Sequence, residues 1–160
     1  MEKIGSIVSV STKGICEVVD VKENAFVGAV KGKLYYVLKP IENTNNMLVY
    51  LPVDGGVQIR KLVGKAEAKK IIEGFADIDE IPISSELERL KIYNDIAKSG
   101  NISEWAKLLK TLKTRKEKLS KKQISSVEQK MLNTISTCVV DELSVVLDKP
   151  KTEIEERLAL

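Results

Sequence analysis

The spacing of apolar residues changes once along this chain, and that change constrains the fold more than any other feature. Residues 33–40 and 47–53 are rich in β-branched and aromatic side chains, and they flank the asparagine-rich segment 41–46. Asparagine favours turns, whereas branched and aromatic side chains favour strands, so this stretch predicts a β-hairpin. Segments before residue 64 have a strand-like pattern, and those after it have the spacing of amphipathic helices.

Residues 1–63 are expected to form a small β domain. Short strands are expected at 7–10 and 15–21 around a Lys13-Gly14 turn, and a closing strand at 57–60 follows the hairpin. Five short strands with tight turns are typical of a small SH3-like or Tudor-like barrel.

Residues 64–160 are expected to form an all-helical bundle, so the predicted class is α+β with two domains. Helix ends are predicted from residues with capping chemistry. These are Ser84 or Ser85, Ser99-Gly100, Asn101, the Ser125/Glu128 capping box and Pro150. Apolar anchors recur at helical spacing. They are Ala66, Ile71 and Ile72, then Trp105, Leu108, Leu109 and Leu112, then Val127, Met131, Ile135, Cys138, Val139 and Val146.

Composition argues against an enzyme and against a metal site. The 160-residue chain has no histidine, the commonest general base and metal ligand. It also lacks the glycine-rich motifs that cradle phosphates. Its two cysteines, Cys16 and Cys138, are far apart and are expected to be packing residues rather than a disulfide. We therefore expect a binding module with no catalytic residues, no cofactor, no metal and no small-molecule substrate.

The chain also lacks the sequence features of a membrane or secreted protein. No apolar run approaches the roughly 20 residues that a membrane helix needs. The first residues lack the apolar core of a signal peptide. We expect a cytoplasmic protein with no membrane partner.

The segment 105–122 is the most basic part of the chain. It holds eight lysines and arginines and a single acid, Glu117. Lys107, Lys110 and Lys113 recur on one predicted helix face, opposite the leucines. With little local neutralisation, this face could bind DNA phosphates with strong salt dependence and low sequence specificity. The alternative is a solvated helix face.

A series of short matches, in order along the chain, gives a family resemblance. The matches are Lys3-Ile4-Gly5, Gly14, Gly28, Tyr35-Tyr36-Val37-Leu38, Leu51-Pro52-Val53, Ile59-Arg60, Leu119-Ser120, Glu128-Gln129-Lys130-Met131-Leu132 and Asp141-Glu142-Leu143. With these matches the chain resembles the CarD/CdnL family of bacterial transcription regulators. Its β part is also similar to the RNA-polymerase-interacting domain of the transcription-repair coupling factor.

The resemblance implies a non-enzymatic factor with two partners. Residues 1–63 would bind the β-subunit lobe of RNA polymerase, and residues 64–160 would contact upstream promoter DNA and modulate open-complex stability. The residues implied for polymerase binding are Asn24, Phe26, Tyr36, Leu48, Tyr50 and Pro52. For DNA binding, Arg89 and Lys91 align with basic residues of the family and join the candidates of the basic segment, which are Lys107, Lys110, Lys113, Arg115 and Lys116.

This chain departs from the family pattern at both expected surfaces. Asn24 and Tyr50 stand where the family often has arginine, so docking would be less ionic and more aromatic. The family's DNA-wedging tryptophan aligns near Ser85-Glu86-Leu87, where no aromatic occurs, and Trp105 is expected to lie in the core instead. One alternative is a polymerase-binding protein–protein adaptor whose helical domain does not contact DNA. A further alternative is an RNA- or ribosome-associated barrel protein.

Overall fold

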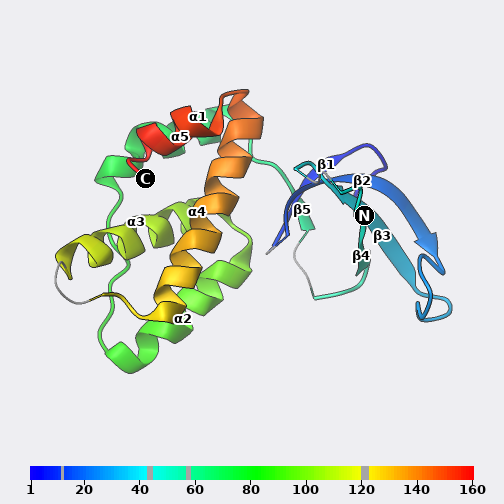
Figure 1. The fold of residues 1–160 in the computed structure, drawn as a ribbon, viewed down its shortest axis with the longest axis horizontal. Helices are drawn as coiled ribbons and strands as arrows, with labels where there is room; N and C mark the ends of the chain where they lie inside the picture. Colours follow the sequence, from blue (N-terminus) through cyan, green and yellow to red (C-terminus); the bar gives the residue numbers. More distant parts are fainter. Residues whose placement is uncertain (12, 43–44, 57–58, 120–122) are drawn as a thin grey trace. The chain divides into compact units, whose positions relative to one another are not determined.

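The computed structural model describes residues 1–11, 13–42, 45–56, 59–119 and 123–160. It divides the chain into two compact units, Met1–Leu62 and Val63–Leu160 (Figure 1). The first unit contains strands and the second contains helices, so the predicted α+β class is confirmed. The matched Ser120, the lysines at 121–122 and the predicted strand residues 57–58 lie outside the described residues.

The N-terminal unit is a five-stranded antiparallel sheet with the strand order β4-β3-β2-β1-β5. The strands are β1 (Ile7–Val10), β2 (Gly14–Glu23), β3 (Leu34–Pro40), β4 (Val49–Pro52) and β5 (Ile59–Lys61). The long strand β2 pairs with both β1 and β3, and its register with β3 shifts between Val18 and Asp20. A bulge of this kind bends a strand and increases its twist. The order leaves β4 and β5 at the two edges of the described sheet.

One face of this sheet forms the core of the N-terminal unit. Its buried side chains are Val8, Val10, Cys16, Val18, Tyr36 and Leu38. The Tyr36 hydroxyl accepts a hydrogen bond of 2.8 Å from the Glu2 amide. Both Tyr35 and Tyr36 are buried, since each is only 5% exposed. Alternation does place them on opposite faces, but the connection after β2 folds over the outer face and covers Tyr35.

The C-terminal unit is a helical bundle organised around one long helix. Its elements are α1 (Lys65–Gly74), η1 (Phe75–Asp77), α2 (Glu86–Ser99), α3 (Ile102–Lys118), α4 (Ser126–Leu147) and α5 (Lys151–Arg157). Helix α4 packs against α1, α2, α3 and α5, so it forms the centre of the bundle (Figure 1).

The predicted capping residues begin and end these helices. The Ser85 hydroxyl accepts from the Glu88 amide, and Gly100 ends α2 in the left-handed conformation (φ 71°). The Asn101 side chain opens α3 by accepting from two backbone amides, and Ser125 forms the predicted capping box with Glu128.

Most predicted apolar anchors lie in the helical core, with two exceptions. Trp105 is 2% exposed and donates its indole N–H to the Ala97 carbonyl at 3.2 Å, so its predicted core position is confirmed. Ala66 is exposed, and Ala68 is the buried alanine of α1 instead. Val127 is 50% exposed, because the first turn of α4 presents it away from the packed face.

Both cysteines are buried and free, as expected of packing residues. Over the residues described, no group of three or more acidic or cysteine side chains could hold a metal ion. The described helices are too short or too polar to cross a membrane.

Candidate functional site

The edge strand β4 is one of two surfaces suited to a partner. All four of its residues are half-buried, and only one of its sides is paired in the sheet order. An unpaired edge presents backbone N–H and C=O groups that can accept a strand from another protein. Pro52 lacks an N–H group, which is tolerated at an edge but not in a central strand.

An aromatic cluster lies on the outer face of the sheet beside this edge. Tyr50 pairs with Val37, and Pro52 pairs with Tyr35, so these four residues share a face. The Phe26 ring makes a T-shaped contact with Tyr35 (centroids 5.2 Å apart) and a tilted contact with Tyr50 (5.3 Å). The Tyr35 hydroxyl accepts a hydrogen bond from the Val30 amide at 3.2 Å. The cluster is therefore ordered while Phe26 remains 41% exposed.

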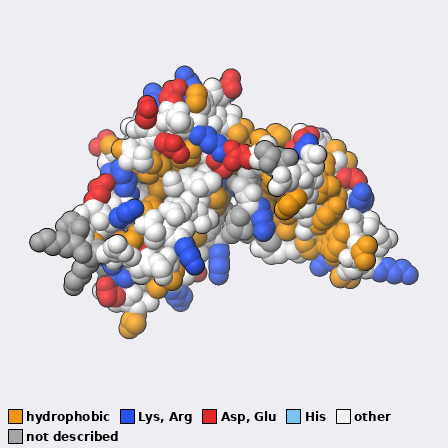
Figure 2. Space-filling view, in the orientation of Figure 1, with side chains coloured by type: hydrophobic (Ala, Val, Ile, Leu, Met, Phe, Trp, Pro, Cys, Tyr) orange, Lys and Arg blue, Asp and Glu red, His pale blue; other side chains and the backbone are white. Residues whose placement is uncertain are grey.

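Exposed hydrophobic side chains occur in the connection that holds Phe26 and in the segment that leads into β4. Val27, Val30, Met47 and Leu48 are 104%, 61%, 65% and 41% exposed. Figure 2 shows hydrophobic side chains covering much of the visible face of the sheet unit. Large apolar patches on a folded domain often mark interaction sites.

The residues predicted to bind polymerase therefore divide into two groups. Phe26, Leu48, Tyr50 and Pro52 lie at or beside the β4 edge, and Asn24 is exposed in the left-handed conformation (φ 50°) at the end of β2. Tyr36 does not belong with them. Its side chain faces the core, so its placement in a docking surface is incorrect.

Helix α3 carries the second candidate surface, and its lysines differ in how strongly they are held. Lys110 donates to the Ala76 carbonyl at 3.0 Å and lies over the Phe75 ring. Lys113 Nζ lies 3.8 Å from the Glu117 carboxylate, a long distance for an ion pair. In the part of the chain that the structure describes, Lys107 and Lys116 have no carboxylate partner. They are the cations of α3 most available to phosphate.

The two arginines of the predicted DNA surface are committed to a buried acid. Glu128 is 1% exposed, and its Oε1 lies 2.9 Å from Arg115 Nε and 3.1 Å from Arg89 Nε. The contact with Arg89 is an ion pair whose geometry does not meet the angle of a hydrogen bond. Glu86, on the exterior, adds contacts of 2.8 Å to Arg89 and 3.9 Å to Arg115. These four charges join α2, α3 and α4.

Glu128 is held in its charged form despite its burial. Burial alone raises the pKa of this carboxyl. Hydrogen bonds from the Ser125 amide (3.1 Å) and hydroxyl (2.9 Å), together with Arg115, outweigh that effect and lower the pKa of Glu128 below its ordinary value. The hydrogen bond between Glu86 and Arg89 likewise lowers the pKa of Glu86 and raises the pKa of Arg89.

The prediction that the basic segment lacks neutralising partners is therefore wrong in part. Acids from other segments supply them: Glu128 and Glu86 from two neighbouring helices for Arg115, and Glu80 from the connection before α2 for Lys118, at 2.8 Å. Figure 2 accordingly shows blue and red side chains interspersed over the helical unit. The capping-box spacing predicts the position of Glu128 at the start of a helix. Nothing else in the sequence predicts its contacts with the two arginines.

The first turn of α2 presents a single apolar side chain. Leu87 is 94% exposed and lies two residues after the capping residue Ser85. Lys91, one turn further, is also exposed. The exposed face of this turn therefore combines an apolar tip with a nearby cation.

Comparison with known proteins identifies the family. No curated protein shows a significant match to this chain. The family described as CarD, C-terminal domain, matches residues 70–159, which is more than half of the chain. The matched range includes the second half of α1 and all of α2, α3, α4 and α5. The chain therefore belongs to the CarD family of transcription regulators.

Proposed function

We propose that this protein binds the β-subunit lobe of RNA polymerase through the β4 edge and contacts promoter DNA through its helical unit. Family membership supports a role in transcription. The observation that carries the proposal is the β4 edge strand, with its ordered Phe26–Tyr35–Tyr50 cluster and the exposed apolar side chains of the adjoining segments. A strand from the polymerase would pair with β4, and the cluster would supply aromatic contacts where the family often has arginine.

The polymerase contact is tested by binding to the isolated β-subunit lobe. A buried glutamate in an apolar interface has a high desolvation cost, so Tyr50→Glu is expected to weaken binding at least about tenfold. Lys61→Glu, an exposed position on the opposite edge strand β5, is the matched control and should bind normally. Equal binding by wild type and Tyr50→Glu would exclude the β4 edge, and no binding by the wild type would reject the polymerase contact.

The helical unit is proposed to bind DNA phosphates through the lysines of α3. Lys107 and Lys116 are its best candidates, with Lys110 and Lys113 contributing after release from their weaker partners. The exposed Leu87 lies in the segment near which the resemblance places a wedging tryptophan, and leucine is among the apolar side chains that insert between base steps. The factor would then favour the open complex by its difference in affinity for the open and closed states.

The DNA contact is tested through its salt dependence. Reversing Lys107 and Lys116 to glutamate should weaken binding to promoter DNA and lower the slope of log K against log salt by about 2, roughly one unit per lost phosphate contact. Lys65→Glu, which changes an exposed lysine on α1, is the control. The open-complex lifetime should fall with the double variant and not with the control.

A second candidate function is a polymerase-binding adaptor that makes no DNA contact. The pairing of Arg89 and Arg115 with Glu128 favours it, because these guanidinium groups are not available to phosphate. If wild-type protein binds the β lobe but the salt-dependent DNA binding is absent, the adaptor function is correct.

A further inference from the structure

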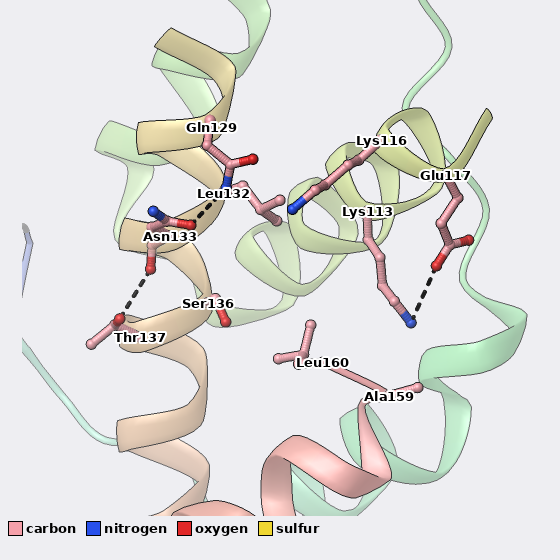
Figure 3. Close-up of a pocket in the computed structure, with 10 residues that line it drawn as sticks. All are labelled: Lys113, Lys116, Glu117, Gln129, Leu132, Asn133, Ser136, Thr137, Ala159 and Leu160. Atoms are coloured by element: carbon pink, nitrogen blue, oxygen red, sulfur yellow. Dashed lines mark hydrogen bonds and ion pairs between the residues drawn. The ribbon is translucent and has the colours of Figure 1, made fainter. Parts of the chain in front are cut away.

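We propose that a hollow between α3 and α4 is a binding site for a nucleotide, with the phosphate on α3 and the base against α4. The hollow has a volume of about 700 Å³, within the range typical of small-molecule sites. Its walls come from the last two turns of α3, the first half of α4 and the residues after α5 (Figure 3). This site goes beyond the function proposed above and can be tested without polymerase.

The α3 wall supplies positive charge. Lys113 and Lys116 are three residues apart and both line the hollow. Figure 3 shows the Lys116 ammonium pointing into it, beside Leu132. Among the residues that the structure describes, Glu117 is the carboxylate that pairs with Lys113, at 3.8 Å, and the Glu117 side chain is 64% exposed. An exposed pair of this kind is weak, so an entering phosphate can displace the Glu117 carboxylate and bind both lysines.

The α4 wall supplies neutral polar groups at helical spacing. Gln129 donates its amide N–H to Asn133 Oδ1 at 2.8 Å, and the Thr137 hydroxyl donates to the Asn133 backbone carbonyl at 3.0 Å. These bonds leave the Gln129 carbonyl oxygen as an acceptor and the Ser136 hydroxyl as a donor or acceptor. Both face the hollow in Figure 3. They can hydrogen-bond the edge of a nucleobase, but they cannot neutralise a phosphate.

The floor between these walls is apolar. Leu132 is 8% exposed, and Leu160, which is 43% exposed, points into the hollow from the opposite side. A planar base can pack on these aliphatic side chains while its edge reaches α4. The hollow has charge on one wall, amide and hydroxyl groups on the other, and an apolar floor. This combination matches a nucleotide better than a simple anion. The nucleotide could be free or part of a nucleic-acid strand.

Calorimetry and NMR titration of the full chain test this site with defined probes. We expect AMP or ATP to bind at one site, adenosine or pyrophosphate to bind much more weakly, and shifted amide signals to lie in α3 and α4. Lys116→Glu should weaken binding about tenfold to a hundredfold, the effect of losing one charge-assisted hydrogen bond. Lys65→Glu, the same charge change at an exposed position on α1 outside the hollow, should have little effect.

Ser136→Ala separates a nucleotide site from a basic surface, because it changes no charge. It should weaken AMP binding and leave the weak binding of pyrophosphate unchanged. A short single-stranded oligonucleotide tests whether the nucleotide is part of a nucleic-acid strand. If the oligonucleotide binds better than AMP and Ser136→Ala weakens its binding, the natural ligand is a strand. The proposal is overturned if pyrophosphate binds as tightly as ATP, if Ser136→Ala has no effect on either ligand, or if no probe binds.

Discussion

Glu128→Gln tests the central claim about the helical unit, that a buried carboxylate joins three helices. Removing one partner of a buried ion pair typically costs about 3–5 kcal/mol. Here the cost should be smaller, because the Arg89 and Arg115 side chains keep 13% and 29% exposure and can reach water. Glutamine also retains an oxygen that can accept from Ser125. We expect the free energy of unfolding to fall by about 2–3 kcal/mol.

The single tryptophan makes this measurement specific to one unit. Trp105 is buried in the helical core, so its fluorescence during urea unfolding reports the unit that contains Glu128. For a domain of this size the loss corresponds to a melting temperature lower by roughly 10–20 °C. Glu86→Gln, which changes the 83%-exposed acid of the same cluster, is the control and should have a much smaller effect.

The difference in free energy of unfolding between wild type and Glu128→Gln should depend on pH in a defined direction. Because the folded state lowers the pKa of Glu128, its stabilising contribution is present above the ordinary glutamate pKa of about 4.3 and is lost as the pH falls through the lowered value. Wild type and Glu128→Gln should therefore differ in free energy of unfolding at pH 7, and the difference should shrink as the pH falls through the lowered pKa of Glu128. Identical unfolding curves at pH 7 would refute the role assigned to this carboxylate.

Three further predictions concern the two cores. Trp105→Ala should lower the free energy of unfolding by about 3–5 kcal/mol, measured by circular dichroism; a normal stability would contradict its core position. Burial raises the pKa of the Cys16 thiol to about 11, so the native protein should react slowly with a thiol reagent at pH 8, and fast labelling without denaturant would contradict this. Tyr36→Phe removes the acceptor for the Glu2 amide and should cost about 0.5–1.5 kcal/mol in urea unfolding of the sheet unit.

Features that depend on local chemistry could be predicted from the sequence. Ser85, Gly100 and Ser125 act on backbone groups within a few residues, so their spacing alone indicates where α2 and α4 begin and where α2 ends. The stripe that contains Trp105 was predictable for a similar reason, since helical periodicity sets which side chains share a face.

Features that depend on distant segments could not be predicted in this way. Tyr35 is buried because Phe26 and the Val30 amide reach it from the connection between two strands, and strand alternation contains no information about that cover. The partners of Arg115 lie on α2 and α4, so counting charges within α3 alone overestimated the free positive charge. The sequence predicts that Leu87 lies at the start of a helix, but it does not predict that the side chain is exposed.

The β4 edge has a consequence for how the protein behaves at high concentration. The backbone of β4 can pair with a strand of the partner or with a strand of a second copy of this chain. Backbone groups alone do not select between the two, since every peptide group offers the same donors and acceptors. Two features of β4 limit such self-pairing: it is four residues long, and Pro52 removes one donor. Selectivity for the correct partner must then come from side chains, and the Phe26–Tyr35–Tyr50 cluster is the group beside the edge that can provide it.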